Sequence, residues 1–215
     1  IRKLPDGKLR AFVNGAPEPL DDHALAACRA ALACRAALAE LNDAIEREHG
    51  LRLGMRTGVN TGEVVVGNVG STRKRNYTVL GDAVNLASRL EGANKETGTS
   101  ILLGPLTATR VAATMLLRPV ARLQVKGKTQ AVEVSELLAE RDGADDATVA
   151  FAAVFTRGFE AYCERRFEQA CADFAGALAL RPEDLPSAHY LAEARRFVAA
   201  PPGPEWHGIL KLETK

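Results

Sequence analysis

The chain has 215 residues, of which 26% are charged and 47% hydrophobic, so it can bury a substantial core and is not a disordered protein. Its 28 basic and 27 acidic side chains leave a formal net charge of +1, which excludes a global field that would recruit nucleic acid or an anionic membrane. Any anion-binding site must therefore be local.

The first residues predict a β-hairpin. Two partly alternating runs within residues 1–13 flank Pro5, Asp6 and Gly7, a tripeptide typical of a turn. The chain begins at Ile1, without a Met, inside what reads as a strand. We therefore expect it to be a fragment of a longer protein.

A long amphipathic helix is predicted from residue 21 or 22 to about residue 48, with His49 and Gly50 ending it. Four cysteines lie in Ala-rich helical patterns without a Cys-x-x-Cys pair, which indicates buried thiols of a reducing compartment: Cys28, Cys34, Cys163 and Cys171. No apolar run approaches ~18 residues and there is no signal peptide. We expect a cytoplasmic chain without membrane contact of its own, in a parent that an upstream segment can tether to a membrane.

Two strands, over residues 51–59 and 63–69, are predicted next, and a basic loop at 71–75 reads as solvated. Residues 76–91 then read as a strand that turns at Gly81 and enters a helix. If Asp82 caps this helix, Asn85 and Arg89 lie one turn apart on one face. Such a pair can hold a phosphorylated ligand, because Arg offers a planar fork of donors and keeps its proton. Spacing alone favours an ordinary exposed polar face.

The remaining elements of this part are a strand at 100–103, a helix over 104–114 and a hairpin of strands 116–125 and 131–138. Strands and helices in mixed order over one sheet indicate an α+β fold, which we place in residues 1–140. A polar linker is predicted at 141–149.

Residues 150–200 have the spacings of a tetratricopeptide helix pair followed by a third helix. Small residues are expected where helices touch, among them Gly158, and Pro182 follows the second helix. A Pro-rich break and tail fill residues 201–215. The tail carries the chain's single Trp, Trp206, which we expect to dock on this helical unit or on a partner.

Two motifs together identify a family resemblance: residues 58–70, GVNTGEVVVGNVG, and residues 77–91, YTVLGDAVNLASRLE. They resemble the class III adenylate/guanylate cyclase catalytic domain of bacterial type, over about its C-terminal two thirds. The helical tail resembles the tetratricopeptide-like extension of some bacterial cyclases. The resemblance implies a ferredoxin-like palm domain, truncated at its N-terminus, that pairs head to tail with a second such domain, in the simplest case as a homodimer.

The resemblance also implies roles for individual residues. Asn85 would orient the ribose, and Arg89 would stabilise charge on the α-phosphate as it becomes five-coordinate. Thr78 and Lys3 match the base-selecting positions, and this pair favours ATP over GTP, since guanine-selective members place Cys and Glu there. Lys126 matches the phosphate-binding Lys of the closing hairpin.

The family uses two Mg²⁺ or Mn²⁺ ions held by two Asp residues, and here the sequence departs from its pattern. The strand with the first Asp is absent from this chain, and the position of the second is occupied by Gly7, with Asp6 displaced by one residue. Without the ions nothing offsets the charge of the triphosphate. We therefore expect the isolated chain to be inactive or nearly so.

Three functions are compatible with these observations. The first is a fragment of an adenylate cyclase, a phosphorus–oxygen lyase that converts ATP to cyclic AMP and pyrophosphate in intracellular signalling. The second is a non-catalytic cyclase-homology module for dimerisation or signalling, whose helical unit recruits a protein partner. The third, a pure interaction protein, is hard to reconcile with Asn85, Arg89 and Lys126 occurring together.

Overall fold

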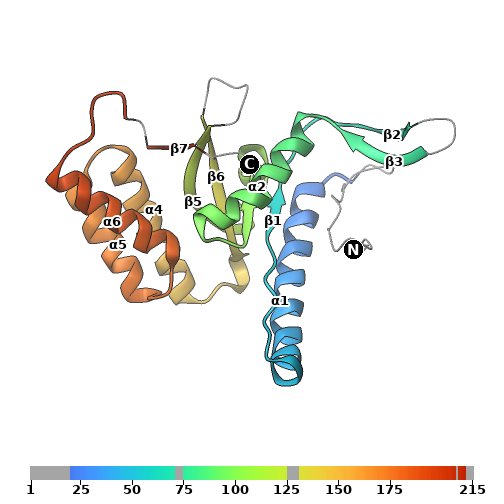
Figure 1. Ribbon diagram of the computed structural model, residues 1–215, viewed down its shortest axis with the longest axis horizontal. Coiled ribbons are helices and arrows are strands. Elements are labelled where there is room, and N and C mark those ends of the chain that lie inside the picture. The colour runs from blue at the N-terminus through green and yellow to red at the C-terminus, as the bar shows by residue number, and fades with distance from the viewer. Residues whose placement is uncertain (1–19, 71–74, 125–130, 207, 212–215) are drawn as a thin grey trace.

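The protein was analysed as a computed structural model that describes residues 20–70, 75–124, 131–206 and 208–211 (Figure 1). The hairpin predicted within residues 1–13 lies outside the described residues. The mixed order of helices and strands confirms the predicted α+β class.

The long helix α1 spans His23–His49, close to its predicted bounds. It ends because Gly50 takes the left-handed conformation, with φ +65°, and donates its N–H to the carbonyl of Glu46. The buried side of α1 is narrow and made of small side chains, chiefly Ala24, Cys28 and Ala31. Small side chains let α1 lie close to the elements beneath it.

The main sheet has five strands in the order β1-β4-β6-β5-β7. Their bounds are β1 Thr57–Val59, β4 Ile101–Leu103, β5 Met115–Gln124, β6 Ala131–Glu140 and β7 Ile209–Lys211. The β5–β6 hairpin and the β4–β6 pair are antiparallel, whereas β1–β4 and β5–β7 are parallel. The predicted closing hairpin is thus confirmed, and β7 is an element that the sequence did not reveal.

Strand β4 shows how the sheet separates two cores. Ile101 and Leu103 pack with α1 and with α3 (Pro105–Val111), while Leu102, between them, packs with α2 (Asp82–Thr97) and the C-terminal helices. All three side chains are fully buried. The period of two along a strand therefore places helices on both faces of the sheet.

Strands β2 (Val65–Gly70) and β3 (Arg75–Leu80) form a separate antiparallel arm, which projects from the body beside the start of α2 (Figure 1). The predicted strand over 51–59 is too long, because only Thr57–Val59 pair. Leu51 and Leu53 are more than half exposed and lie before the strand. Their apolar character suggested a buried strand that the chain does not form.

The C-terminal helices are α4 (Asp146–Cys163), α5 (Phe167–Leu180) and α6 (Leu185–Ala199). A short 3₁₀ turn at Arg141–Gly143 precedes α4, which begins inside the stretch predicted as linker. Gly158 lies against Phe174, to which an added Cβ would come within 3.2 Å, so small residues do bring α4 and α5 together. That these helices form a tetratricopeptide-like unit stays a prediction.

Trp206 docks on this helical unit, which is one of the two alternatives that the sequence predicted. Its ring centroid lies 5.1 to 5.5 Å from those of Tyr162, Phe167 and Phe197. Edge-to-face contacts at these distances are favourable beyond the area that they bury.

The cysteines are free thiols, but only Cys28 is buried, and the other three are partly exposed, so the prediction of four buried thiols was wrong in part. Burial raises the pKa of Cys28 to about 11, which leaves it unreactive. Within the described residues, no helix combines the length and the apolar character needed to cross a bilayer.

Candidate functional site

The candidate site begins at the turn between β3 and α2. Gly81 has φ +150°, a conformation that side chains rarely adopt, and its carbonyl accepts the N–H groups of Val84 and Asn85. Gly81 is therefore the N-cap of α2. The expectation that Asp82 caps the helix was wrong: Asp82 is the first helical residue, where its charge favours the helix dipole.

Asn85 and Arg89 lie one turn apart on α2, directly after the strand that carries Thr78. Asn85 is exposed, while Thr78 and Arg89 are half-buried. Among the described residues, neither Asn85 nor Arg89 has a hydrogen-bond or ion-pair partner for its side chain. Glu91, the acidic residue closest to Arg89 along the helix, is instead bound by Arg56 at 3.1 Å. The guanidinium of Arg89 is thus available to an anion.

Helix α2 is held very close to the sheet. A Cβ added to Gly58 of β1 would lie 2.2 Å from the carbonyl oxygen of Ala87, so the helix backbone rests directly on the strand. About two turns further on, the amide of the buried Asn94 donates to the carbonyl of Thr57 at 3.0 Å. These contacts fix the helix that carries Asn85 and Arg89.

The loop after β1 holds the start of the same helix. Asn60 donates its side-chain amide to the carbonyl of Ala83 at 3.0 Å. Gly62 packs so closely on Ala83 that an added Cβ would lie 2.7 Å from the Ala Cβ. The sequence predicts residues 60–62 as the connection between two strands, with Gly62 serving a turn or a close backbone approach, but it does not reveal the contact of Asn60 with α2. An Asn among glycines after a strand was the available signal, but it is equally typical of a turn.

The remaining predicted site residues cannot be placed. Lys3, Asp6 and Lys126 lie outside the described residues, although β5 ends at Gln124, two positions before Lys126. The described part of the chain contains no group of three or more His, Cys, Asp or Glu side chains that fits a metal ion. The expected Mg²⁺ or Mn²⁺ site therefore receives no support from these residues.

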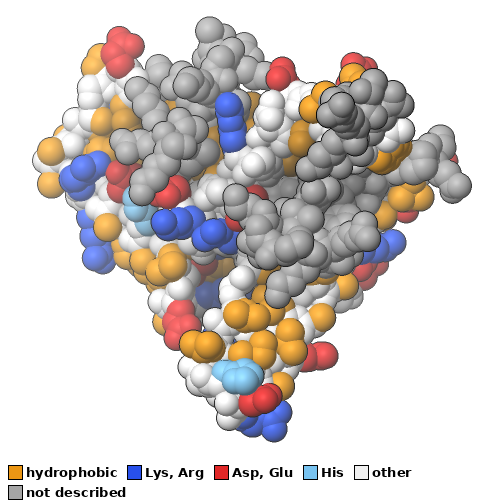
Figure 2. Space-filling view, turned by 45° about the vertical axis from the view of Figure 1, so that its right-hand side comes forward, with side chains coloured by type: hydrophobic (Ala, Val, Ile, Leu, Met, Phe, Trp, Pro, Cys, Tyr) orange, Lys and Arg blue, Asp and Glu red, His pale blue; other side chains and the backbone are white. Residues whose placement is uncertain are grey.

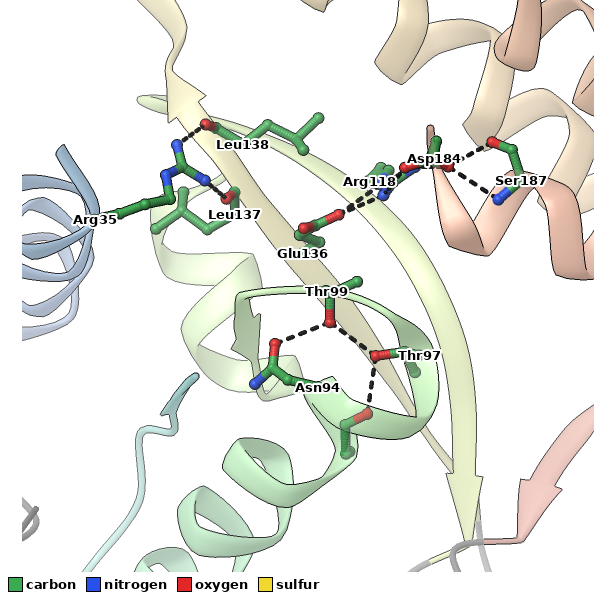
Figure 3. Close-up of polar contacts among 11 residues, drawn as sticks. Arg35, Asn94, Thr97, Thr99, Arg118, Glu136, Leu137, Leu138, Asp184 and Ser187 are labelled. Atoms are coloured by element: carbon green, nitrogen blue, oxygen red, sulfur yellow. Dashed lines mark hydrogen bonds and ion pairs between the residues drawn. The ribbon is translucent and has the colours of Figure 1, made fainter. Parts of the chain in front are cut away.

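A cavity of about 350 Å³ lies elsewhere, between the sheet and the C-terminal helices. None of the predicted site residues lines it. Arg118, only 2% exposed, dominates its wall and donates to Glu136 at 2.7 Å and to both carboxylate oxygens of Asp184 at 2.8 and 2.9 Å (Figure 3). The guanidinium is hydrogen-bonded to both carboxylates, so this cluster joins the sheet to the start of α6.

The part of the chain that contains the β3–α2 region is similar to known proteins. The profile of the family described as "Adenylate and Guanylate cyclase catalytic domain" matches residues 7–135. Adenylate cyclase 1 of Rhizobium meliloti is 40% identical over 124 residues, which are 57% of this chain and 18% of that protein. The chain thus spans less than a fifth of this relative.

Two solved structures resemble the same part of the chain. The adenylyl cyclase CyaB from P. aeruginosa matches with a TM-score of 0.55 and 28% identity, covering 63% of this chain and 73% of that one. The guanylyl cyclase Cya2 matches with a TM-score of 0.52 and 30% identity, covering 61% and 66%. With the family profile matched over more than half of its length, the chain belongs to the adenylate and guanylate cyclase catalytic domain family.

Proposed function

We propose that this chain supplies the ribose-orienting and charge-stabilising half of an adenylate cyclase site. The observation that carries the proposal is the pair Asn85 and Arg89, fixed on α2 by backbone contacts with β1 and left without side-chain partners among the described residues. A guanidinium held half-buried and unpaired beside a strand end is suited to a phosphate. Membership of the cyclase family supports the same assignment.

In the proposed reaction the ribose 3′ oxygen of ATP attacks the α-phosphorus and loses its proton to solvent. A new bond from this oxygen to phosphorus forms as the bond to pyrophosphate breaks, which yields cyclic AMP. Asn85 hydrogen-bonds the ribose and holds the 3′ oxygen in line. Arg89 donates to the α-phosphate oxygens, where negative charge accumulates in the five-coordinate transition state.

The other predicted residues complete the substrate site. Lys3 and Thr78 select adenine. Lys126, of the closing hairpin, binds the phosphates of the nucleotide. Thr78 is half-buried on β3, directly opposite Gly67 of β2, so nothing large shields it on the neighbouring strand. ATP is therefore the proposed substrate, and the proposal is tested by comparing the turnover of ATP with that of GTP.

A second cyclase domain is the proposed partner, in the simplest case another copy of this chain. The β2–β3 arm supports this, because Val65, Tyr77 and Leu80 on it are 71%, 58% and 51% exposed, and Val65 and Leu80 pair across the arm. Hydrophobic side chains also gather at the lower tip of the face in Figure 2, where the end of α1 and residues 50–55 lie. Exposed apolar patches of this kind are typical of interaction surfaces.

The decisive experiment is a cyclase assay on the full-length parent with Arg89→Ala. We expect turnover to fall by about 100-fold or more, as for removal of one transition-state hydrogen-bond donor, with the oligomeric state unchanged. Lys95→Ala is the matched control, a cation on the same helix but in its last turn. If Arg89→Ala turned over ATP at an unchanged rate with Mg²⁺ or Mn²⁺, the role assigned to Arg89 would be wrong. If the parent used GTP as well as ATP, the predicted preference for ATP would be wrong.

The alternative is a non-catalytic cyclase-homology module whose helical unit recruits a protein partner. The observation in its favour is Gly7 at the position where the family has its second metal-binding Asp. Assaying parent and fragment side by side separates the two functions. A parent that makes cyclic AMP, beside an inactive fragment, supports the cyclase; two inactive proteins that still dimerise support the module.

A further inference from the structure

The C-terminal helical unit contacts strand β5 at successive points along its length. At Arg118, the guanidinium reaches Asp184, the N-cap of α6, through two hydrogen bonds of 2.8 and 2.9 Å (Figure 3). Further along the strand, the buried hydroxyl of Tyr190 donates to the carbonyl of Val120 at 2.7 Å. Arg118 is only 2% exposed and the bond of the Tyr190 hydroxyl is buried, so solvent competes little with either contact.

The tail makes the last of these contacts. Strand β7 pairs with β5 in parallel, with Ile209 opposite Arg122 and Lys211 opposite Gln124. The chain reaches this edge through Gly208, which has φ +65° and at which an added Cβ would lie 3.5 Å from the Trp206 ring. Because Trp206 is wedged among aromatic rings of α4, α5 and α6, the pairing of β7 is anchored to the helical unit.

The helical unit also contacts helix α2. Leu185, the first residue of α6, lies against Gly98, the left-handed residue that ends α2. A Cβ added to Gly98 would come within 2.7 Å of the Cβ of Leu185. The same corner of the helical unit, Asp184 and Leu185, therefore contacts β5 and α2 together.

We propose that the helical unit and its tail position the cyclase site, with Trp206 as the positioning residue for the end of β5. This inference rests on the proposed function, in which β5 leads to Lys126 and α2 carries Arg89. Without β7, residues 122–124 would be the open edge of the sheet, and open edges and strand ends exchange and fray most readily. Trp206 thereby acts on nucleotide binding without touching the nucleotide.

The test compares tail variants of the full-length protein by hydrogen exchange. In Trp206→Ala we expect the amides of residues 120–124 to exchange about tenfold faster or more, with β4 unchanged, because only the edge loses its partner. Gly208→Ala is the milder variant, strained at φ +65°, and keeps the chain's only Trp as a fluorescent reporter of docking. Gly203→Ala is its matched control, since an added Cβ there meets nothing within 4 Å.

The functional readout is the affinity for a non-hydrolysable ATP analogue, together with KM and kcat for ATP. We expect Trp206→Ala to weaken analogue binding and raise KM about threefold to tenfold, with kcat changed less, since phosphate binding in the ground state is affected first. Val154→Ala, which thins the packing of α4 on α5 beside Gly176, controls for general destabilisation and should leave KM unchanged.

The outcomes are separable. Unchanged exchange at residues 120–124 in Trp206→Ala would overturn the anchoring of β5, and faster exchange with unchanged analogue affinity would overturn the positioning role. If the wild-type parent makes no cyclic nucleotide and does not bind the analogue, the proposed function fails, while the exchange data still decide whether the tail holds β5.

Discussion

At the scale of single residues, Arg118 is the most constrained charge in the described structure. Its guanidinium lies over the rings of Phe151 and Phe155, at 4.8 and 4.3 Å from their centroids, and is hydrogen-bonded to Glu136 and Asp184. Removing one partner of such a buried pair leaves an uncompensated charge, which is more costly than the pair itself is favourable. Arg118 thus fixes where the helices meet the sheet.

A pH-dependent stability follows for Asp184. Burial would raise the pKa of this carboxyl group, but hydrogen bonds from Arg118 and Ser187 lower it below its usual value. The stabilisation is therefore complete above the ordinary Asp pKa and is lost as the pH falls through the lower value of the folded state. We expect Asp184→Asn, which keeps the helix cap, to reduce the free energy of unfolding by about 3 kcal/mol at neutral pH.

Urea unfolding of wild type and Asp184→Asn across acidic pH checks this prediction. The difference between the two should start to shrink below about pH 4, where Asp184 becomes protonated in the unfolded wild type, and shrink further down to the lower pKa of the folded state. Asp142→Asn, at an exposed position in the 3₁₀ turn, should show no such difference at any pH. If the difference in the free energy of unfolding stayed constant down to about pH 2, the charge of Asp184 would not be what stabilises the contact between the helices and the sheet.

Local sequence could not predict this cluster. An arginine within a strand is ordinarily a solvated residue, and its main partner, Asp184, lies 66 positions away. By contrast, Asn85 and Arg89 were predictable because their relation is one turn of a single helix, fixed by the sequence itself. Their proximity on α2 is confirmed, and their catalytic roles stay predictions.

At the scale of elements, the packing of α2 on β1 depends on the absence of a side chain at Gly58. The order of helices, strands and the closing hairpin in residues 21–138 was largely predictable, from the helical periodicity of α1 and from the turn residues that bound the strands. The close approach of backbones was predicted only as one of two alternatives, because a glycine in a strand can serve a turn or a close contact. The turn at Gly81 into α2 was predicted and is confirmed, but the cap is Gly81 itself and not the side chain of Asp82.

We expect Gly58→Ala to destabilise the protein by about 3 kcal/mol or more, because its Cβ would overlap the Ala87 carbonyl and force α2 away from the sheet. Gly92→Ala is the matched control, since Gly92 lies within α2 and an added Cβ meets nothing within 4 Å. That substitution should be neutral or stabilise by up to about 1 kcal/mol. Thermal unfolding of both variants decides the matter, and similar melting temperatures would contradict the close packing.

At the scale of the whole molecule, the helical unit and the sheet share one hydrophobic core. Leu102, Val120 and Leu123 of the sheet belong to the same cluster as Phe155 and Tyr190 of the helices. The sequence indicated a boundary near residue 141 because composition changes there, and composition says little about what packs across a boundary. The docked Trp206 was predicted as one of two alternatives, whereas β7 was too short to be recognised.

A shared core predicts that the first 144 residues do not form a stable unit. Truncation after Ala144 would expose the face of β5 and leave Arg118 without Asp184. We expect the truncated protein to be insoluble, or to melt at least about 10 °C below the full chain. Circular dichroism with thermal unfolding measures this, and a soluble fragment with the melting temperature of the full chain would show that the helices are an independent domain.

The parallel pairing of β7 with β5 also has a consequence for how the chain folds during synthesis. Strand β5 leaves the ribosome long before Lys211, and at about 5–20 residues per second the edge waits several seconds for its partner. Contacts between residues this distant in sequence form late in folding, because the entropy cost of closing the loop between them must be overcome first. A nascent chain would thus expose an unpaired edge until the tail arrives, which makes the last step of folding the one most open to aggregation and to chaperone binding.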